Sequence, residues 1–292
     1  MITGSITALV TPMTPDGEID HDALGTLVER QIDAGTAAIV SVGTTGESAT
    51  LSVLEHTEVV HGTIEAAAGR VPVIAGTGAN STSEAIHLTR AAKASGADAC
   101  LLVTPYYNKP PQEGLYQHFK AVAEAVAIPQ YLYNVPGRTG CDLLPSTVAR
   151  LAEIRNIVGL KEAKPDLDRV RELVALELDD FALYSGEDAT ARASMLAGFN
   201  GVVSVTANVA PETNARMCKA AIAGDVENAS ALDNELSGLH QALFTDPNPI
   251  PVKWALAELG LIRHGIRLPL VPLDEWHHED VRAALRQAGL LS

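Results

Sequence analysis

The sequence predicts an α/β fold, a (β/α)8 TIM barrel followed by a C-terminal helical appendage. Eight short apolar runs, rich in Val, Ile and Leu, alternate with longer amphipathic segments. Apolar runs without polar alternation are typical of parallel strands buried on both faces, and strict strand–helix alternation is the order of a barrel. A doubly wound dinucleotide-binding sheet fits less well, because the first run leads into Thr11-Pro12-Met13 and not into a GxGxxG turn.

The predicted strands and helices follow this alternation along the chain. The strands are expected over the apolar runs Ile6–Val10, Ala38–Val42, Val71–Ala75, Ala99–Val103, Gln130–Asn134, Ile157–Lys161, Phe181–Ser185 and Gly201–Val205. Between the strands, apolar residues recur at helical spacing with charge on the opposite face. Helices of this kind are expected over Asp22–Ala34, Val53–Ala68, Ser83–Ala94, Gln112–Val126, Leu167–Leu178 and Glu187–Leu196.

Local signals mark where several of these helices begin and end. Ser52 with Glu55, and Ser81 with Glu84, have the spacing of a capping box, in which each side chain bonds the other residue's backbone N–H. Helices often end in a left-handed glycine. Glycines stand at three of the expected ends, namely Gly35, Gly69 and Gly96.

The strand–helix alternation ends near residue 224, so we expect two domains. Residues 1–224 are expected to form the catalytic barrel, and residues 225–292 a C-terminal helical domain. Helices are expected in this second part over Val226–Leu243, Pro251–Glu258 and Asp280–Ala288, separated by prolines. No low-complexity linker precedes it, so it is expected to pack on the barrel.

Composition narrows the class of protein. The net charge of −15 disfavours a nucleic-acid partner, because phosphate binding needs clustered Lys and Arg. Cys100, Cys141 and Cys218 are odd in number and lack CxxC spacing, so neither a disulfide framework nor a zinc site is expected. No signal peptide and no bilayer-length apolar run is evident, so we expect a cytoplasmic protein without a membrane partner.

Six of the nine histidines are expected to lie on the surface. His277, His278 and Glu279 are consecutive and cannot easily converge on one ion, so no metal site is expected there. Four others fall on predicted helices and are expected to be solvated, namely His56, His61, His87 and His118.

The predicted active site lies at the carboxyl ends of the strands, as in other TIM barrels. Polar and Gly-rich segments follow the apolar strands there. They are Gly43–Glu47, Gly76–Asn80, Thr104–Tyr107, Tyr133–Arg138, Lys161–Glu162 and Gly186–Asp188. Such strand ends are what a substrate pocket at one face of the barrel requires.

Lys161 is the sharpest signal among these strand ends. It follows Ile157–Leu160 on a strand that should be buried, and a lysine is almost never buried unless it is paired or functional. Burial disfavours the charged ammonium and favours the nucleophilic amine, which can form an imine with a carbonyl substrate. The alternative is a surface pair of Lys161 with Glu162 at a frayed strand end, and spacing alone leaves both interpretations open.

Residues at two further strand ends carry suitable chemistry. Tyr133 could relay protons beside an imine-forming lysine, or be a core aromatic. Thr44 and Thr45 lie in a Gly-bracketed turn whose backbone N–H groups could hold a carboxylate, or they lie in an ordinary turn. Arg138, after Pro136-Gly137, could clamp a carboxylate, or be a solvated loop arginine.

Three motifs on these strands resemble signatures of a known family. They are Gly43-Thr44-Thr45-Gly46-Glu47-Ser48, Tyr133-Asn134-Val135-Pro136-Gly137-Arg138-Thr139-Gly140 and Gly159-Leu160-Lys161-Glu162-Ala163. Their order and placement are similar to those of the dihydrodipicolinate synthase family, within the pyruvate-dependent class I aldolases. The resemblance runs from Gly4 to Leu290, essentially the whole chain, and three separated motifs make it specific.

The resemblance implies a lyase that condenses pyruvate with L-aspartate 4-semialdehyde through a lysine Schiff base. This reaction begins the diaminopimelate branch of lysine biosynthesis. By resemblance, Lys161 forms the imine and Tyr133 donates and accepts protons. Thr44 joins Tyr133 in a proton relay with Tyr107, which reaches in from a neighbouring subunit.

The resemblance also implies the residues that bind the substrates. Thr45 holds the pyruvate carboxylate, Val203 supplies a backbone contact, Arg138 receives the semialdehyde, and Gly186 belongs to the substrate-binding set. No metal and no organic cofactor is expected. The expected assembly is a homotetramer, a dimer of tight dimers.

Lysine-sensitive members of the family bind the end product at the tight-dimer interface, so L-lysine is an expected effector. The positions that match this site are Ser48, Ala49, His56, Asn80, Glu84 and Tyr106. Val53 departs from the pattern, since sensitive relatives often carry His there. The interpretation of Glu84 as a capping residue and of Tyr106 as an interface aromatic stays open.

Two other functions remain as alternatives. One is another pyruvate-dependent aldolase, such as N-acetylneuraminate lyase or a keto-sugar-acid aldolase. Arg138 argues against it, because a guanidinium suits a carboxylate better than a polyol. The other is a non-catalytic regulatory relative, which would normally have lost Lys161 or Tyr133.

Overall fold

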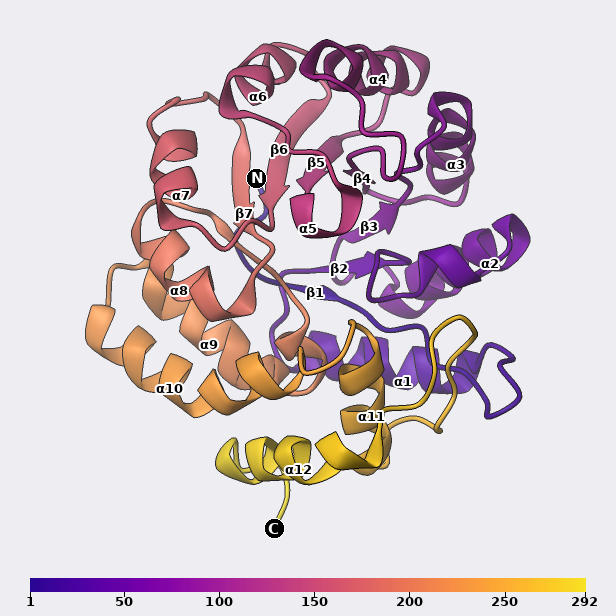
Figure 1. The fold of residues 1–292 in the computed structure, drawn as a ribbon, viewed down its shortest axis with the longest axis vertical. Helices are drawn as coiled ribbons and strands as arrows, with labels where there is room; N and C mark the ends of the chain where they lie inside the picture. The colour runs from indigo at the N-terminus through magenta and orange to yellow at the C-terminus, as the bar shows by residue number, and fades with distance from the viewer.

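The computed structural model describes residues 1–292 and contains the predicted barrel. Eight parallel strands close on themselves in chain order, with β1 paired to both β2 and β8 (Figure 1). The strands are β1 (Gly4–Ala8), β2 (Ala38–Ser41), β3 (Val73–Gly76), β4 (Ala99–Val103), β5 (Gln130–Asn134), β6 (Ile157–Glu162), β7 (Ala182–Ser185) and β8 (Gly201–Ser204). Each overlaps its predicted range, so the TIM-barrel prediction is confirmed.

The helices form a ring around the strands, and α5 lies in front of the barrel end (Figure 1). Their bounds are α1 (His21–Asp33), α2 (Val53–Ala67), α3 (Thr82–Ala94), α4 (Gln112–Ala125), α5 (Pro136–Thr139), α6 (Pro145–Ala152), α7 (Leu167–Val174), α8 (Asp188–Leu196) and α9 (Pro211–Ile222). Short 3₁₀ turns η1 (Ser48–Thr50) and η2 (Thr206–Asn208) follow β2 and β8. Helix α7 ends at Val174, before the predicted end at Leu178, where Glu177 has a left-handed φ of 47°.

Apolar residues build two layers of core. Alternate strand residues point inward and fill the barrel, as the period of two in a strand requires. The inward cluster includes Ile6, Val40, Ile74, Leu101, Tyr131, Tyr133, Tyr184 and Val203. The other strand residues face the helices and pack in two larger clusters. Strands with apolar residues on both faces are therefore buried on both faces, as predicted.

The capping signals have different outcomes. Ser52 and Glu55 form the predicted capping box, with Glu55 N–H donating to Ser52 Oγ and Ser52 N–H to Glu55 Oε2. The second capping box is wrong: the side chain of Ser81 caps no backbone N–H and pairs with Ser83 Oγ at 3.0 Å. Glu84 therefore has no capping role. The predicted terminal glycines are all left-handed: Gly35, Gly69 and Gly96.

The C-terminal part consists of helices, as predicted. They are α10 (Val226–Ala242), α11 (Ile250–Glu258), η3 (Glu275–His277) and α12 (His278–Gln287). Helices α10, α11 and α12 lie together on one side of the barrel (Figure 1), and α10 contacts α8 and α9. The division at residue 224 falls in the turn between α9 and α10 and stays a prediction. No helix is both long enough and apolar enough to cross a bilayer.

Candidate active site

Lys161 and Tyr133 lie side by side at the carboxyl ends of β6 and β5. They are direct partners in the strand register, and Lys161 Nζ lies 4.1 Å from the centre of the Tyr133 ring. Both side chains are only 6% exposed. Neither the amine of Lys161 nor the hydroxyl of Tyr133 has a hydrogen-bond partner in the chain. An amine that can act as a nucleophile thus lies over the ring of a tyrosine that can carry protons, and both side chains are buried.

Glu162 points the other way and does not pair with Lys161. Its carboxylate accepts hydrogen bonds from Asn134 Nδ2 at 3.0 Å, from Lys164 N–H at 3.0 Å and from Arg169 Nη1 at 3.2 Å. Burial raises its pKa to about 7 despite these donors. The alternative of a surface Lys161–Glu162 pair is therefore wrong, because adjacent strand residues face opposite sides of the barrel wall.

Gly186 packs directly against Lys161. A β-carbon placed on Gly186 would come within 2.9 Å of Lys161 Cε and 2.6 Å of Ala163 Cβ, closer than real contacts allow. Any larger residue at position 186 would displace the lysine side chain. Val203, another predicted substrate-binding residue, is buried inside the barrel on β8.

The turn after β2 has the geometry of a carboxylate site. The N–H groups of Gly46, Glu47 and Ser48 bond carbonyls within the turn. Those of Thr44 and Thr45 bond no acceptor in the chain. Adjacent unpaired backbone N–H groups are what an anion requires. Thr45 is buried, whereas Thr44 is partly exposed.

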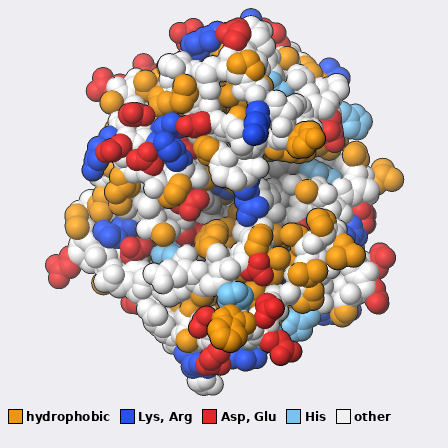
Figure 2. Space-filling view, viewed as in Figure 1, with side chains coloured by type: hydrophobic (Ala, Val, Ile, Leu, Met, Phe, Trp, Pro, Cys, Tyr) orange, Lys and Arg blue, Asp and Glu red, His pale blue; other side chains and the backbone are white.

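A cavity of about 360 Å³ opens beside this turn, between the barrel end and the loop before α11. Its walls include Thr44, Arg138 and Asn248, while Lys161 and Tyr133 lie outside the lining. Figure 2 shows this face hollowed near its middle, with a Lys or Arg side chain exposed in the hollow. Arg138 is exposed and uses one N–H of its guanidinium, Nη2, on the carbonyl of Asn248 at 3.3 Å. Its other donors are unused.

Arg138 lies on a single turn of helix and not in an irregular loop. Pro136 begins the short helix α5, where its fixed φ and missing N–H cost nothing. Gly140 ends the helix in a left-handed conformation. The position of the guanidinium is thus set by one turn of helix immediately after β5.

Tyr107 lies apart from Lys161 within one chain. Its side chain is 89% exposed, and its φ of 75° is unusual for a bulky residue. No hydrogen bond joins it to Thr44 or Tyr133. The proton relay that the sequence predicts is therefore incomplete in a single chain.

The residues predicted to bind lysine gather along one wall of the same cavity. Ser48, Ala49, His56, Glu84 and Tyr106 line it, and so does Val53. Asn80 is not in the lining. Its backbone accepts a hydrogen bond from Asn108 Nδ2 and lies next to Tyr106.

Two of the helix histidines are buried, which corrects the prediction that they are solvated. His56 packs into the cavity wall, and burial lowers the pKa of its imidazole. His118 packs against Phe119, and burial lowers its pKa to about 4. Both face the barrel because they fall on the inward stripes of α2 and α4. His61 and His87 are exposed, as predicted.

The sequence analysis gives no role to two residues near the site, Glu187 and Asn248. Burial and Asp188 raise the pKa of Glu187, whereas Lys161 and Arg138 lower it, so this carboxyl lies near both cations. Asn248 donates to Thr45 Oγ1 at 3.0 Å, and its own buried Oδ1 has no partner. The position of Glu187 directly after Gly186 was a usable signal. Nothing in the sequence links Asn248 to Thr45.

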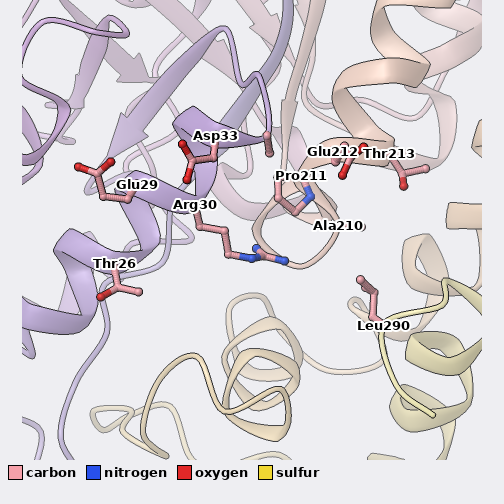
Figure 3. Close-up of a pocket in the computed structure, with 10 residues that line it drawn as sticks. Thr26, Glu29, Arg30, Asp33, Ala210, Pro211, Glu212, Thr213 and Leu290 are labelled. Carbon is pink, nitrogen blue, oxygen red and sulfur yellow. The ribbon is translucent and has the colours of Figure 1, made fainter.

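A second hollow, of about 540 Å³, lies between α1 and α9 (Figure 3). Its cation Arg30 already donates to the carbonyls of Asn208 at 2.7 Å and Val209 at 2.6 Å. Its acid Glu29 pairs with Arg70. No group of three His, Cys, Asp or Glu side chains in the protein is arranged to hold a metal ion.

Comparison with known proteins identifies the family of the chain. The model of the "Dihydrodipicolinate synthetase family" matches residues 1–288. A protein of Methylococcus capsulatus named 4-hydroxy-tetrahydrodipicolinate synthase is 65% identical over 291 residues, covering 100% of both chains. The crystal structure of the chloride-inhibited dihydrodipicolinate synthase from Acinetobacter baumannii complexed with pyruvate is 57% identical, with a TM-score of 0.98 over 100% of both chains. The structure of the enzyme from Cyanidioschyzon merolae with lysine bound is 42% identical, with a TM-score of 0.96 over 99% of both chains. Matches of this extent show that the chain belongs to the dihydrodipicolinate synthetase family.

Proposed function

We propose that this chain is a lyase that condenses pyruvate with L-aspartate 4-semialdehyde, the 4-hydroxy-tetrahydrodipicolinate synthase reaction of lysine and diaminopimelate biosynthesis. The observation that carries the proposal is the unpaired, buried amine of Lys161 beside the Tyr133 ring. The full-length relative of the same name supports it. The cytoplasm is the proposed location.

Pyruvate binds first, with its carboxylate at the N–H groups of Thr44 and Thr45. The amine of Lys161 adds to the C2 carbonyl, and the carbinolamine loses water to give an imine. Tyr133 passes the protons that addition and dehydration require. Loss of a proton from C3 then gives an enamine, which is the carbon nucleophile.

The second substrate is attacked at its aldehyde carbon. The enamine carbon forms the new C–C bond, and the aldehyde oxygen takes up a proton to become the hydroxyl of the product. The amino group of the semialdehyde then adds to the imine carbon and displaces Lys161, which closes the ring and frees the amine. The net reaction releases one water.

Charge at the pocket suits a substrate with a carboxylate and an ammonium. Arg138 offers unused donors for the carboxylate, and Glu187 offers an acceptor for the ammonium. A polyol aldehyde offers neither charge. A coupled assay with pyruvate and either aspartate semialdehyde or N-acetylmannosamine tests the proposal. Turnover with the semialdehyde is expected; turnover only with the sugar would assign the chain to the aldolase alternative.

The Arg138→Ala substitution is expected to weaken binding of the semialdehyde and to leave binding of pyruvate unchanged. A hydrogen-bonded charge is worth about 1.5–3 kcal/mol, so kcat/KM for the semialdehyde should fall roughly tenfold or more. Borohydride trapping of pyruvate should be unchanged. Arg150→Ala is the matched control, because Arg150 pairs with Glu113 on the surface. Unaltered semialdehyde kinetics in Arg138→Ala would place that substrate elsewhere.

The proposed assembly is a homotetramer in which Tyr107 enters the site of a neighbouring copy. Its exposure and its left-handed backbone support this, since an exposed aromatic held in a strained conformation needs surroundings that a single chain lacks. A partner hydroxyl would complete the relay of Thr44 and Tyr133.

Mixing two inactive variants tests the shared site. Tyr107→Phe and Lys161→Arg proteins, once their subunits exchange, are expected to regain part of the wild-type activity, because some hybrid sites then contain both native residues. Exchange is followed independently with differently tagged subunits. Exchange without any recovery would contradict a site shared between subunits.

The proposed effector is L-lysine, bound along the wall formed by Ser48, Ala49, His56, Glu84 and Tyr106, with Asn80 beside it. Glu84 has no capping role and is exposed in the cavity, so its carboxylate can accept an α-ammonium. The lysine-bound relative supports the proposal. Because this wall and Arg138 line one cavity, a bound lysine would lie near the semialdehyde pocket.

Partial inhibition by L-lysine is the expected result. Val53 lacks the polar contact of a histidine, and a lost hydrogen bond of about 1 kcal/mol weakens binding about fivefold. Dose–response curves at subsaturating pyruvate measure the effect. Glu84→Ala should abolish inhibition without altering pyruvate trapping, and Glu124→Ala, on the surface of α4, should not. Full activity at saturating lysine would contradict the site.

A further inference from the structure

The turn that presents Thr44 and Thr45 is a strained one. Val42 and Glu47, on either side of it, have left-handed φ values of 53° and 57°. Such a conformation is costly for residues with a β-carbon, above all for a β-branched one like Val42. Surrounding structure must hold it in place.

Close packing supplies part of that support. A β-carbon on Gly46 would come within 2.8 Å of Val42 Cα, so the two ends of the turn touch. Thr11 Oγ1 donates to the carbonyl of Gly46 at 2.7 Å. These contacts come from residues of the barrel, and neither of them involves the side chain of Glu47.

The C-terminal helices fix that side. Lys253 on α11 forms an ion pair with Glu47, and their side chains are only 4% and 0% exposed. The second oxygen of Glu47 accepts from the backbone N–H of Arg267 at 3.3 Å. Asn248, just before α11, donates to Thr45 Oγ1. Two side chains from one short segment thus hold both halves of the Thr45-Gly46-Glu47 turn.

Stability alone does not account for this pair. Desolvating two charges costs free energy, and well-packed apolar residues of the same size are often equally stabilising. In agreement, burial lowers the pKa of Lys253, although Glu47 opposes the shift. A directional contact provides what an apolar pair lacks, a defined position for the backbone at Glu47.

We propose that Glu47 and Lys253 are positioning residues, whose buried ion pair holds the N–H groups of Thr44 and Thr45 in register with the pyruvate carboxylate. The helical C-terminal part is then a component of the pyruvate site. The proposal rests on the proposed function for the identity of the first substrate only. It has a specific consequence. Loss of the ion pair weakens binding of pyruvate and does not weaken binding of the semialdehyde, which Arg138 holds.

The double variant Glu47→Gln/Lys253→Met tests this. It removes both charges, keeps both chain lengths, and leaves an amide oxygen for the Arg267 N–H. The half-saturating pyruvate concentration for borohydride trapping on Lys161 is expected to rise roughly tenfold. The melting temperature and the KM for the semialdehyde should stay close to wild type. Glu258→Gln, which breaks the α11–α12 pair with Arg282, should change none of these values.

A role in stability alone would give a lower melting temperature with unchanged half-saturation, and that outcome overturns the proposal. Hydrogen exchange in Glu47→Gln provides a second measurement that does not depend on the double variant. Amides of residues 43–48 should exchange faster than in wild type, while those of β6 do not; equal exchange in residues 43–48 also overturns it. Trapping needs no second substrate. A wild-type enzyme that traps pyruvate but fails to use the semialdehyde would therefore contradict the proposed function and leave this inference standing.

Discussion

Lys161→Arg is expected to lose at least roughly 10³-fold in kcat, because the guanidinium stays protonated and cannot form an imine. No other amine can substitute for it. The second lysine buried deeply in the chain, Lys253, is engaged by Glu47. The coupled assay measures the loss, and the melting temperature should change little because Lys161 makes no ion pair.

Lys164→Arg is the matched control, since Lys164 lies on the loop after β6 and pairs with Asp166 near the surface. It should retain wild-type activity. Activity of Lys161→Arg within tenfold of wild type would show that the imine is not formed at this position.

Tyr133→Phe is expected to lower kcat by about 10²–10⁴-fold, the usual contribution of a positioned proton donor. Only the hydroxyl is removed, and it has no hydrogen-bond partner in the chain. The ring that packs beside Lys161 is retained. Stability should therefore be unaffected, and pyruvate trapping should become slow without becoming weak. Time courses of borohydride trapping at saturating pyruvate measure the rate of trapping separately from the affinity for pyruvate.

Tyr116→Phe serves as the control, because Tyr116 lies on α4 under the guanidinium of Arg150, away from the barrel end. Wild-type trapping rates in Tyr133→Phe would remove Tyr133 from the proton relay.

The barrel could be predicted because its strands are buried on both faces. Apolar runs such as Ala38–Ser41 and Ala99–Val103 have no helical period, and each is followed by a polar or Gly-rich turn. The sequence pattern does not predict helices α6 and α9. Both begin with proline, which is a helix breaker in the interior and a good first residue, and only the structure distinguishes the two roles.

Much of the candidate site could also be predicted, because strand ends are contiguous in sequence with the strands that position them. Lys161, Tyr133, Thr45 and Gly186 all come to one end of the barrel for this reason. Contacts between distant segments could not be predicted. The Glu47–Lys253 pair joins residues on β2's loop and α11, and no local pattern relates them.

The proposed lysine-binding wall also includes a residue whose burial could not be predicted from the sequence. His56 has the spacing of an α2 residue, and helical spacing alone does not say which stripe meets the barrel. The structure buries it in the wall of the cavity, and this burial lowers the pKa of its imidazole. Ser81 carried a capping pattern, but its hydroxyl is taken by Ser83.

Borohydride trapping of the wild-type protein with pyruvate, followed by peptide mass mapping, tests the central claim most directly. The account predicts one reduced adduct per chain, on the peptide that contains Lys161, and none without pyruvate. The loss of activity in the coupled assay should parallel the formation of the adduct. An adduct on another lysine, or the absence of any adduct under conditions where the enzyme turns over, would contradict the Schiff-base mechanism.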